Sequence, residues 1–190
     1  MKIEQFNQKL RADTIKYFSC EPVMGDGPQD ADIVLIGEAP GANEVKLGRP
    51  FVGAAGKNLQ KYLDISSLKR EDIYITNVVK IRPVKPSPKT GKPVNRPPDK
   101  RELDFFVSYL FDELEIIAPK TVITLGNFSL KKIYGDEKAV IGELHGKPIK
   151  KDKYILFPMY HPASIIYNRS LEDTFKKDWE KLKETLIKHP

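Results

Sequence analysis

The chain has few of the residues that bind metal ions or form disulfides. Among its 190 residues there is one cysteine, Cys20, and the three histidines stand far apart at positions 145, 161 and 189. One cysteine cannot form a disulfide within the chain, and scattered histidines lack the spacing of metal ligands. The sequence therefore predicts neither a disulfide framework nor a metal site.

Long apolar segments are missing as well. No run approaches the roughly 20 apolar residues that cross a bilayer, and residues 1–18 carry charges throughout, unlike a signal peptide. We therefore expect a cytoplasmic protein that has no contact with membranes.

The net charge of +6, from 32 basic and 26 acidic residues, is compatible with a polyanionic partner, but such charge also occurs in many proteins without one.

Four short apolar segments predict the strands of a buried parallel sheet. They are rich in β-branched residues and span residues 32–37, 73–78, 121–126 and 154–160. Continuous hydrophobicity, rather than alternation, is typical of strands that are covered on both faces.

Helical patterns surround these segments. Apolar residues recur every three or four positions in residues 2–18, 99–120 and 170–186, and Ser170 is the expected N-cap of the last helix. We predict a single α/β domain over residues 1–190. Its architecture is a three-layer α/β/α sandwich with a central four-stranded parallel sheet.

The most distinctive residues follow the predicted strands. GEAPG comes after the first strand, TNVVKIRP ends the second, LGN ends the third and YHPAS ends the fourth. Ligands bind at the carboxyl ends of the strands in an open parallel sheet. We therefore expect these four segments to converge on one edge of the sheet and to form the functional site there.

The glycine-rich segment GEAPGANEVKLGRPFVGAAGK (37–57) fits neither common phosphate-binding motif. Phe51 stands where a P-loop needs a glycine, and Asn58 stands where it needs Ser or Thr. The spacing of the dinucleotide fingerprint is absent too. We interpret the segment as a pocket for a flat, uncharged ring, because glycines let the backbone bend closely around a ligand. Phe51 would supply the stacking face, although core packing is the alternative.

Four motifs together resemble those of the uracil-DNA glycosylase superfamily, most closely its family-four branch of bacterial and archaeal enzymes. They are, in order, GEAPGANEVKLGRPFVGAAGKNL, YITNVVKIRP, TLGN and FPMYHPASII, and the similarity extends from about Gly25 to the C-terminal helix. The resemblance implies the same fold. It also implies a base-excision repair enzyme that flips uracil out of DNA and hydrolyses its N-glycosidic bond.

The resemblance implies roles for individual residues. Phe51 would stack on uracil, and Asn77 would pair with its edge, since an amide can donate to O4 and accept from N3–H. His161 would hydrogen-bond O2 as negative charge develops there. Three residues of the first motif would line the base pocket: Gly37, Glu38 and Ala39.

Positioning of the attacking water is assigned to a carboxylate. Other branches of the superfamily have Asp or Asn before the proline of the first motif, where this chain has Ala39. Glu44 resembles the family-four carboxylate proposed for this task. Glu38 and backbone carbonyls are the alternatives, and we prefer Glu44.

The loop after His161 is expected to contact the DNA duplex. The family places an apolar wedge at Ile165, where it fills the space left by the everted base, and Ile166 is the competing candidate. Ser164 lies in the same loop, and Arg169 would reach a nearby phosphate.

Residues 85–96, KPSPKTGKPVNR, form a loop that is longer than the family's. It has three prolines, no acidic residue and four cations, namely Lys85, Lys89, Lys92 and Arg96. One interpretation is a solvated, semi-rigid surface loop. The other is a contact with the phosphate backbone of DNA, because the loop directly follows the strand that carries Asn77.

We expect no cofactor, although family-four enzymes usually hold a [4Fe–4S] cluster through four cysteines. This chain has Ile81 and Phe106 at two of those positions, and Cys20 would be a remnant of the N-terminal pair. One thiolate cannot hold a cluster that needs four ligands. Apolar packing by Ile81 and Phe106 is expected in its place.

Three hypotheses for the function stay open. The first is a monofunctional uracil-DNA glycosylase that acts on uracil-containing DNA as a monomer, with no obligate protein partner. The second is a related glycosylase for another deaminated base, such as hypoxanthine or xanthine. The third is a non-catalytic module that binds damaged or single-stranded DNA. The combination of Phe51, Asn77 and His161 favours an enzyme, because a mere binder needs no group at uracil O2.

Overall fold

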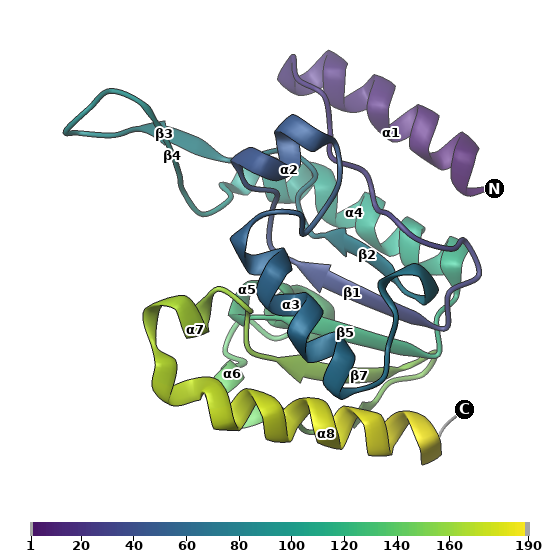
Figure 1. Ribbon diagram of the computed structural model, residues 1–190. Coiled ribbons are helices and arrows are strands. Elements are labelled where there is room, and N and C mark those ends of the chain that lie inside the picture. Colours follow the sequence, from purple (N-terminus) through teal and green to yellow (C-terminus); the bar gives the residue numbers. More distant parts are fainter. Residues whose placement is uncertain (1, 189–190) are drawn as a thin grey trace.

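Five strands form the central sheet of the computed structural model, which describes residues 2–188 (Figure 1). Their order is β2-β1-β5-β7-β6. The bounds are Ile33–Gly37 for β1, Tyr74–Asn77 for β2, Thr121–Leu125 for β5, Ile149–Lys150 for β6 and Ile155–Met159 for β7. The four predicted strands are confirmed as parallel neighbours. The prediction of only four strands was wrong, because β6 adds an antiparallel edge that is too short to leave a hydrophobic pattern.

Helices cover both faces of the sheet and make it the middle of three layers. On one face lie α1 (Ile3–Phe18), α4 (Lys100–Ile117), α5 (Asn127–Tyr134) and α6 (Ile141–Leu144); on the other lie α3 (Ala54–Ile65) and α8 (Glu172–Lys188). In Figure 1, α3 and α8 lie in front of the sheet and α4 lies behind it. The predicted α/β/α sandwich is confirmed.

Alternate residues of β1 belong to the two hydrophobic cores. Val34 and Ile36 pack with residues of α1 and α4, whereas Ile33 and Leu35 pack with residues of α3 and α8. All five residues of β1 are buried. A strand buried on both faces must be apolar throughout, which is why the sequence shows a continuous run there.

The ends of two helices show how far local signals decide the boundaries. The start of α4 carries a capping box, in which the Asp99 carboxylate accepts from Glu102 N–H at 3.0 Å and the Glu102 carboxylate accepts from Asp99 N–H at 2.8 Å. The prediction that Ser170 is the N-cap of the last helix was wrong. It lies in a short 3₁₀ helix, Arg169–Leu171, whose cap is Asn168, and α8 starts after it.

Residues 84–95 form a β-hairpin that projects from the body of the molecule (Figure 1). Its strands are β3 (Val84–Pro86) and β4 (Pro93–Asn95), and Gly91 at φ +67° allows the turn between them. The segment is therefore an exposed β-hairpin rather than an irregular loop. None of the helices within residues 2–188 is long and apolar enough to cross a membrane.

Candidate active site

The carboxyl ends of the parallel strands bring the four distinctive segments together. Gly37 at the end of β1 is paired with Asn77 at the end of β2. The Gly126 N–H, just after β5, donates to the Met159 carbonyl at the end of β7 at 2.8 Å. A Cβ built on Gly126 would lie 3.2 Å from His161 Cβ, so these turns are in contact. The predicted convergence is confirmed.

A cavity of about 260 Å³ opens at this edge of the sheet. Its lining includes five residues that the sequence singled out, namely Ala39, Glu44, Phe51, Asn77 and His161. The rest of the lining is Pro40, Gly41, Ala42, Asn43, Gly53, Ala54, Ala55, Asn95 and Ala163. One hollow thus combines an aromatic ring, an amide, an imidazole and a carboxylate.

The Phe51 ring forms one wall of the cavity. It is 7% exposed, and its centroid lies 5.9 Å from that of His161 with 35° between the ring planes. A Cβ on Gly37 would lie 2.6 Å from Phe51 Cζ and 2.4 Å from Asn77 Oδ1. Gly37, predicted to line the base pocket, is not among the residues that line the cavity. Its missing side chain instead lets the ring and the amide approach each other over the end of β1.

Phe51 has an unusual backbone conformation, with φ at +52°. Such conformations are unfavourable for a residue with a side chain and persist only where the surroundings hold them. The Glu44 carboxylate provides one such restraint, because its Oε1 accepts from Val52 N–H at 3.1 Å and from Gly53 N–H at 2.7 Å. Glu44, in the short helix α2 (Ala42–Leu47), therefore fixes the loop just after Phe51.

Arg70 provides the second restraint. Its guanidinium donates to the Pro50 carbonyl at 2.6 Å and to the Phe51 carbonyl at 3.2 Å. Asp26 holds Arg70 at 3.4 Å and also pairs with Arg49 at 2.8 Å. Residues on both sides of Phe51 are thus tied to the body of the protein.

Asn77 is 3% exposed and is held through its own backbone. The Lys80 ammonium donates to the Asn77 carbonyl at 2.8 Å and pairs with Glu113 at 2.6 Å. The Lys80 side chain is completely buried, and it also donates to Thr76. Burial lowers the pKa of Lys80, and the Glu113 carboxylate opposes that shift. A buried polar network therefore holds the backbone of Asn77 in place.

His161 is held as a neutral hydrogen-bond donor. Ala163 N–H donates to its Nδ1 at 3.1 Å, so Nδ1 is unprotonated and the neutral ring carries its proton on Nε2. Burial lowers the pKa of His161 to about 4. The loop is also tied to α3, because Asn58 Nδ2 donates to the Pro162 carbonyl at 3.3 Å.

The remaining predicted residues lie around this centre rather than in it. Glu38 is not among the residues that line the cavity; its carbonyl accepts from Val79 N–H at 3.0 Å, and burial raises the pKa of its carboxyl group. Ser164 and Ile165 are partly buried beside the cavity, whereas Ile166 and Arg169 are exposed.

The hairpin cations differ in their availability. Arg96 is held in a bidentate pair with Glu102, with N–O distances of 2.8 and 2.7 Å. Lys85, Lys89 and Lys92 are exposed and form no ion pair within the described part of the chain. Arg96 therefore stabilises the base of the hairpin, and only the three lysines are available to a ligand.

Several residues of the site were not found from the sequence. Asn95 lines the cavity from the base of the hairpin, and Asn43 lines it from α2. Arg70 and Lys80 act through backbone carbonyls, and Asn58 holds the loop that contains His161. Arg70 and Asn58 contact distant segments, which no local pattern encodes. Lys80 lies close to Asn77 in the sequence, but its burial depends on the distant Glu113.

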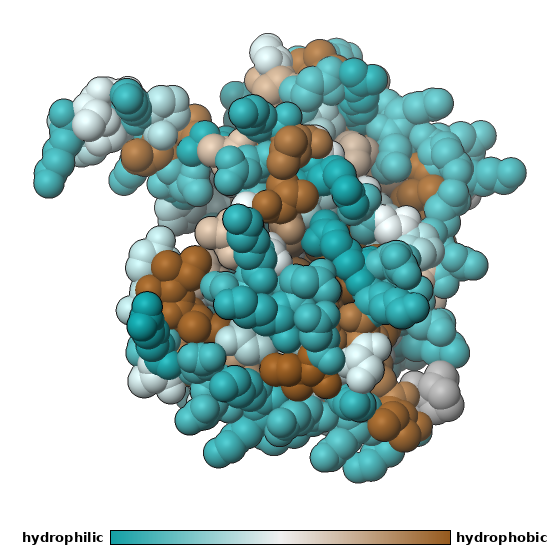
Figure 2. All heavy atoms as spheres, in the orientation of Figure 1, coloured by the Kyte–Doolittle hydropathy of each residue, from teal (hydrophilic) through white to brown (hydrophobic). Residues whose placement is uncertain are grey.

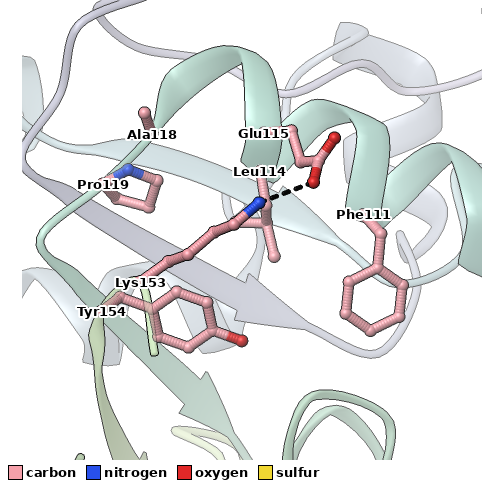
Figure 3. Close-up of a pocket in the computed structure, with 7 residues that line it drawn as sticks. All are labelled: Phe111, Leu114, Glu115, Ala118, Pro119, Lys153 and Tyr154. Atoms are coloured by element: carbon pink, nitrogen blue, oxygen red, sulfur yellow. Dashed lines mark hydrogen bonds and ion pairs between the residues drawn. The ribbon is translucent and has the colours of Figure 1, made fainter. Parts of the chain in front are cut away.

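A larger hollow of about 510 Å³ lies elsewhere, between the end of α4 and the start of β7 (Figure 3). Phe111, Leu114 and Tyr154 form much of its wall, and Lys153 pairs with Glu115 across it at 2.8 Å. It lies where β7 begins, at the edge opposite to the site. It lacks the convergent amide and imidazole of the smaller cavity, which is therefore the candidate active site.

Because the pKa of His161 is about 4, its ring should stay neutral at pH 5. An NMR titration of the ring resonances, assigned with His161→Gln, measures this directly. The unfolded chain takes up this proton near pH 6.5, so the group favours folding above that pH and this contribution is lost as the pH falls toward 4. A midpoint near 6.5 in the folded protein would contradict the buried, neutral ring.

Comparison with known proteins agrees with the geometry. The sequence profile described as Uracil DNA glycosylase superfamily matches residues 24–183. A Type-4 uracil-DNA glycosylase from Sulfurisphaera tokodaii is 40% identical over 178 residues, which cover 90% of this chain and 77% of that protein. Proteins of the same name from Saccharolobus solfataricus and Archaeoglobus fulgidus are 39% and 37% identical, over 91% and 85% of this chain and 80% of each relative. The chain therefore belongs to the uracil-DNA glycosylase superfamily.

Proposed function

We propose that the protein removes uracil from DNA by hydrolysing its N-glycosidic bond. The observation that carries this proposal is that His161, whose Nδ1 accepts a hydrogen bond from Ala163 N–H, lines the same cavity as the Phe51 ring and the Asn77 amide. Its Nε2–H is therefore the group that can donate to a bound base. The relatives named Type-4 uracil-DNA glycosylase support the same activity. Chemistry on a base in a duplex requires that the base leave the stack, and the cavity would receive it.

Each side chain has a task in this reaction. The Phe51 ring stacks on the flat pyrimidine, and the Asn77 amide donates to O4 and accepts from N3–H. Cytosine reverses that pattern and would leave buried groups unpaired. As the bond breaks, negative charge develops on uracil, and His161 Nε2–H donates to O2. A neutral donor suits this task, because the ring needs no proton from solvent to act.

We propose that Glu44 also positions the attacking water. Its Oε1 is occupied by two backbone N–H groups, but its Oε2 accepts no hydrogen bond from residues 2–188. A Cβ on Gly41 would lie 2.7 Å from that Oε2, and one on Gly53 would lie 2.9 Å from Oε1. Glycine at both positions therefore keeps the space around the carboxylate open. Glu38 is the weaker candidate, because it does not line the cavity.

We further propose a monofunctional enzyme. A glycosylase that also cleaves the strand needs an amine to form a Schiff base with the sugar, and no amine-bearing residue of the described chain lines the cavity. Action as a monomer without an obligate protein partner remains an expectation from the sequence. A cytoplasmic location remains the expectation from the sequence.

The other two hypotheses have less support. A glycosylase for hypoxanthine or xanthine could use the same pattern of Asn77, because O6 and N1–H of these purines match O4 and N3–H of uracil. The relatives named Type-4 uracil-DNA glycosylase favour uracil instead. A non-catalytic binding module would need no imidazole at the base, yet His161 is held in a defined tautomer there.

We propose that the protein works without an iron–sulfur cluster. Two of the positions at which the family resemblance places ligands are Ile81 and Phe106, which are 7% and 0% exposed. The Phe106 ring stacks on Phe18 with centroids 5.4 Å apart and contacts Phe105 edge-on at 4.8 Å. Cys20 is exposed. The residues present do not fit a cluster, and aromatic packing between α1 and α4 takes its place.

We also propose that the hairpin contacts the DNA backbone. It starts a few residues after Asn77, and Asn95 at its base lines the cavity. A strand whose uracil lies in the cavity would therefore pass close to Lys85, Lys89 and Lys92. Arg96, the fourth predicted contact, is committed to Glu102 and supports the hairpin instead.

An excision assay tests the proposed function. The protein is incubated with labelled DNA that contains U:G, U:A or hypoxanthine, and alkali then cleaves the abasic sites. We expect cleavage at uracil only. Asn77→Ala and His161→Ala should each raise the barrier of the chemical step by about 2–4 kcal/mol, because each removes a preorganised contact to the leaving base. If the wild-type protein cleaves no lesion, the non-catalytic DNA-binding module is the one hypothesis that remains.

The hairpin contact is tested by the salt dependence of DNA binding. Replacing Lys85, Lys89 and Lys92 by Gln should weaken binding to all sequences alike. It should also flatten the plot of log K against log salt by about 0.9 for each phosphate that the variant no longer neutralises. The matched control replaces three lysines at the opposite edge of the sheet, namely Lys120, Lys150 and Lys153. An unchanged slope in the hairpin variant would show that the hairpin does not touch DNA.

A further inference from the structure

Arg70 contacts the backbone beside the aromatic wall of the cavity, but it does not line the cavity itself. It lies in a short 3₁₀ helix, Arg70–Asp72, just before β2. Its guanidinium donates to the Pro50 carbonyl at 2.6 Å and to the Phe51 carbonyl at 3.2 Å, and no other group of residues 2–188 donates to either carbonyl. Arg70 therefore acts on the path of the chain at Phe51 rather than on a ligand.

The Phe51 peptide fits closely against the start of α3. A Cβ on Gly56 would lie 1.9 Å from the Phe51 carbonyl oxygen, so the chain has room for glycine alone at that position. The Phe51 ring belongs to the hydrophobic core beneath α3 and α8, whose outer surface is mainly hydrophilic (Figure 2). Burial favours an inward ring, but the direction of the Phe51 Cα–Cβ bond follows from its backbone angles. The hydrogen bonds from Arg70 therefore support the left-handed φ of +52° that aims the ring at the cavity.

The Asp26 carboxylate links Arg70 to the residue at the start of the same loop. Its Oδ2 accepts from Arg70 Nη2 at 3.4 Å and from Arg49 Nη2 at 2.8 Å. Arg49 directly precedes Pro50. One carboxylate oxygen therefore restrains the loop twice, through the Arg49 side chain and through the carbonyls that Arg70 contacts. The Asp26 and Arg70 side chains are 31% and 23% exposed, and salt screens such a partly buried pair less than a pair at the surface.

Asp26 is in turn held against β2. Asp26 and Ile75 exchange two backbone hydrogen bonds, each 2.9 Å long, in an antiparallel bridge. Glycines on both sides let this segment approach the sheet, since a Cβ on Gly25 or on Gly27 would lie 2.2 Å from an atom of the facing segment. Ile75 lies two residues before Asn77 on the same strand. The position of Asp26 is thus set by the strand that carries the amide.

We infer, on the basis of the proposed function, that Asp26 and Arg70 are positioning residues for the excision reaction. They hold the Phe51 ring in register with the Asn77 amide, although neither of them lines the cavity. Stacking on Phe51 and hydrogen bonding to Asn77 must act on the same pyrimidine, so a shift of the aromatic wall relative to β2 would weaken one contact or the other. The contacts that run from β2 through Asp26 and Arg70 to Phe51 remove that freedom.

A double-mutant cycle under single-turnover conditions, with a U:G duplex as substrate, tests these roles. Arg70→Gln should slow excision by about tenfold or more, the effect of losing a well-placed stacking partner for a base. Arg70→Lys keeps a cation that can reach one carbonyl and should recover part of the rate. Phe51→Ala should slow excision as well, but adding Arg70→Gln to it should cause no further loss, because Arg70 acts through the ring. A merely structural role would slow both backgrounds by the same factor.

Two further variants complete the cycle. Asp26→Asn retains both arginines and should cause a smaller loss, which should likewise disappear in the Phe51→Ala background. It replaces Arg70→Gln in the cycle if that variant fails to fold. Lys69→Gln is the matched control, because it removes a neighbouring surface charge whose partner, Glu71, lies 3.9 Å away. Its excision rate should stay unchanged.

A crystal structure of Arg70→Gln separates the positioning role from the proposed function. Phe51 should leave the left-handed region in that variant, and its ring should withdraw from Asn77. A φ that stays near +52° would overturn the positioning role, as would equal losses in the two backgrounds of the cycle. If the wild-type protein excises no uracil, the proposed function fails, which is a different result from an unchanged Phe51 backbone.

Discussion

The backbone of Phe51 is the constraint on which the site depends. A phenylalanine at φ +52° is not stable by itself, yet this conformation turns the ring toward Gly37, Asn77 and His161. Glu44 holds the loop on one side of the ring and Arg70 holds it on the other. The aromatic wall of the cavity therefore exists because two charged side chains satisfy the backbone of a strained loop.

Glu44 connects this constraint to the chemistry. One oxygen of its carboxylate fixes the loop, and we assign the other to the attacking water. A comparable arrangement holds Asn77, whose carbonyl accepts from the buried Lys80 beside Glu113. A buried ion pair is weak evidence for stability, and what the pair does here is hold the Lys80 ammonium against the Asn77 carbonyl. Glu44, Arg70 and Lys80 thus fix the backbone of the residues that we propose to contact the base.

The sequence predicted the sheet, the main helices and the convergence of the segments that follow the strands, because each depends on hydrophobic periodicity or on the rule for ligand sites in parallel sheets. The choice of Phe51, Asn77 and His161 within those segments came from the resemblance to the uracil-DNA glycosylase superfamily. It did not predict the two-residue strand β6 or the 3₁₀ turn at Ser170, which carry no periodic signal. The restraint by Arg70 and the burial of Ile165 also escaped prediction. Both depend on contacts between segments far apart in the chain, and a local pattern does not encode such contacts.

The central claim is that one cavity binds uracil through Phe51, Asn77 and His161. A crystal structure of the protein soaked with free uracil tests this most directly. The account predicts a pyrimidine ring that is stacked on Phe51, with O4 and N3 at the Asn77 amide and O2 at His161 Nε2. Uracil bound elsewhere, or bound in this cavity with its polar edge turned away from Asn77 and His161, would contradict the account.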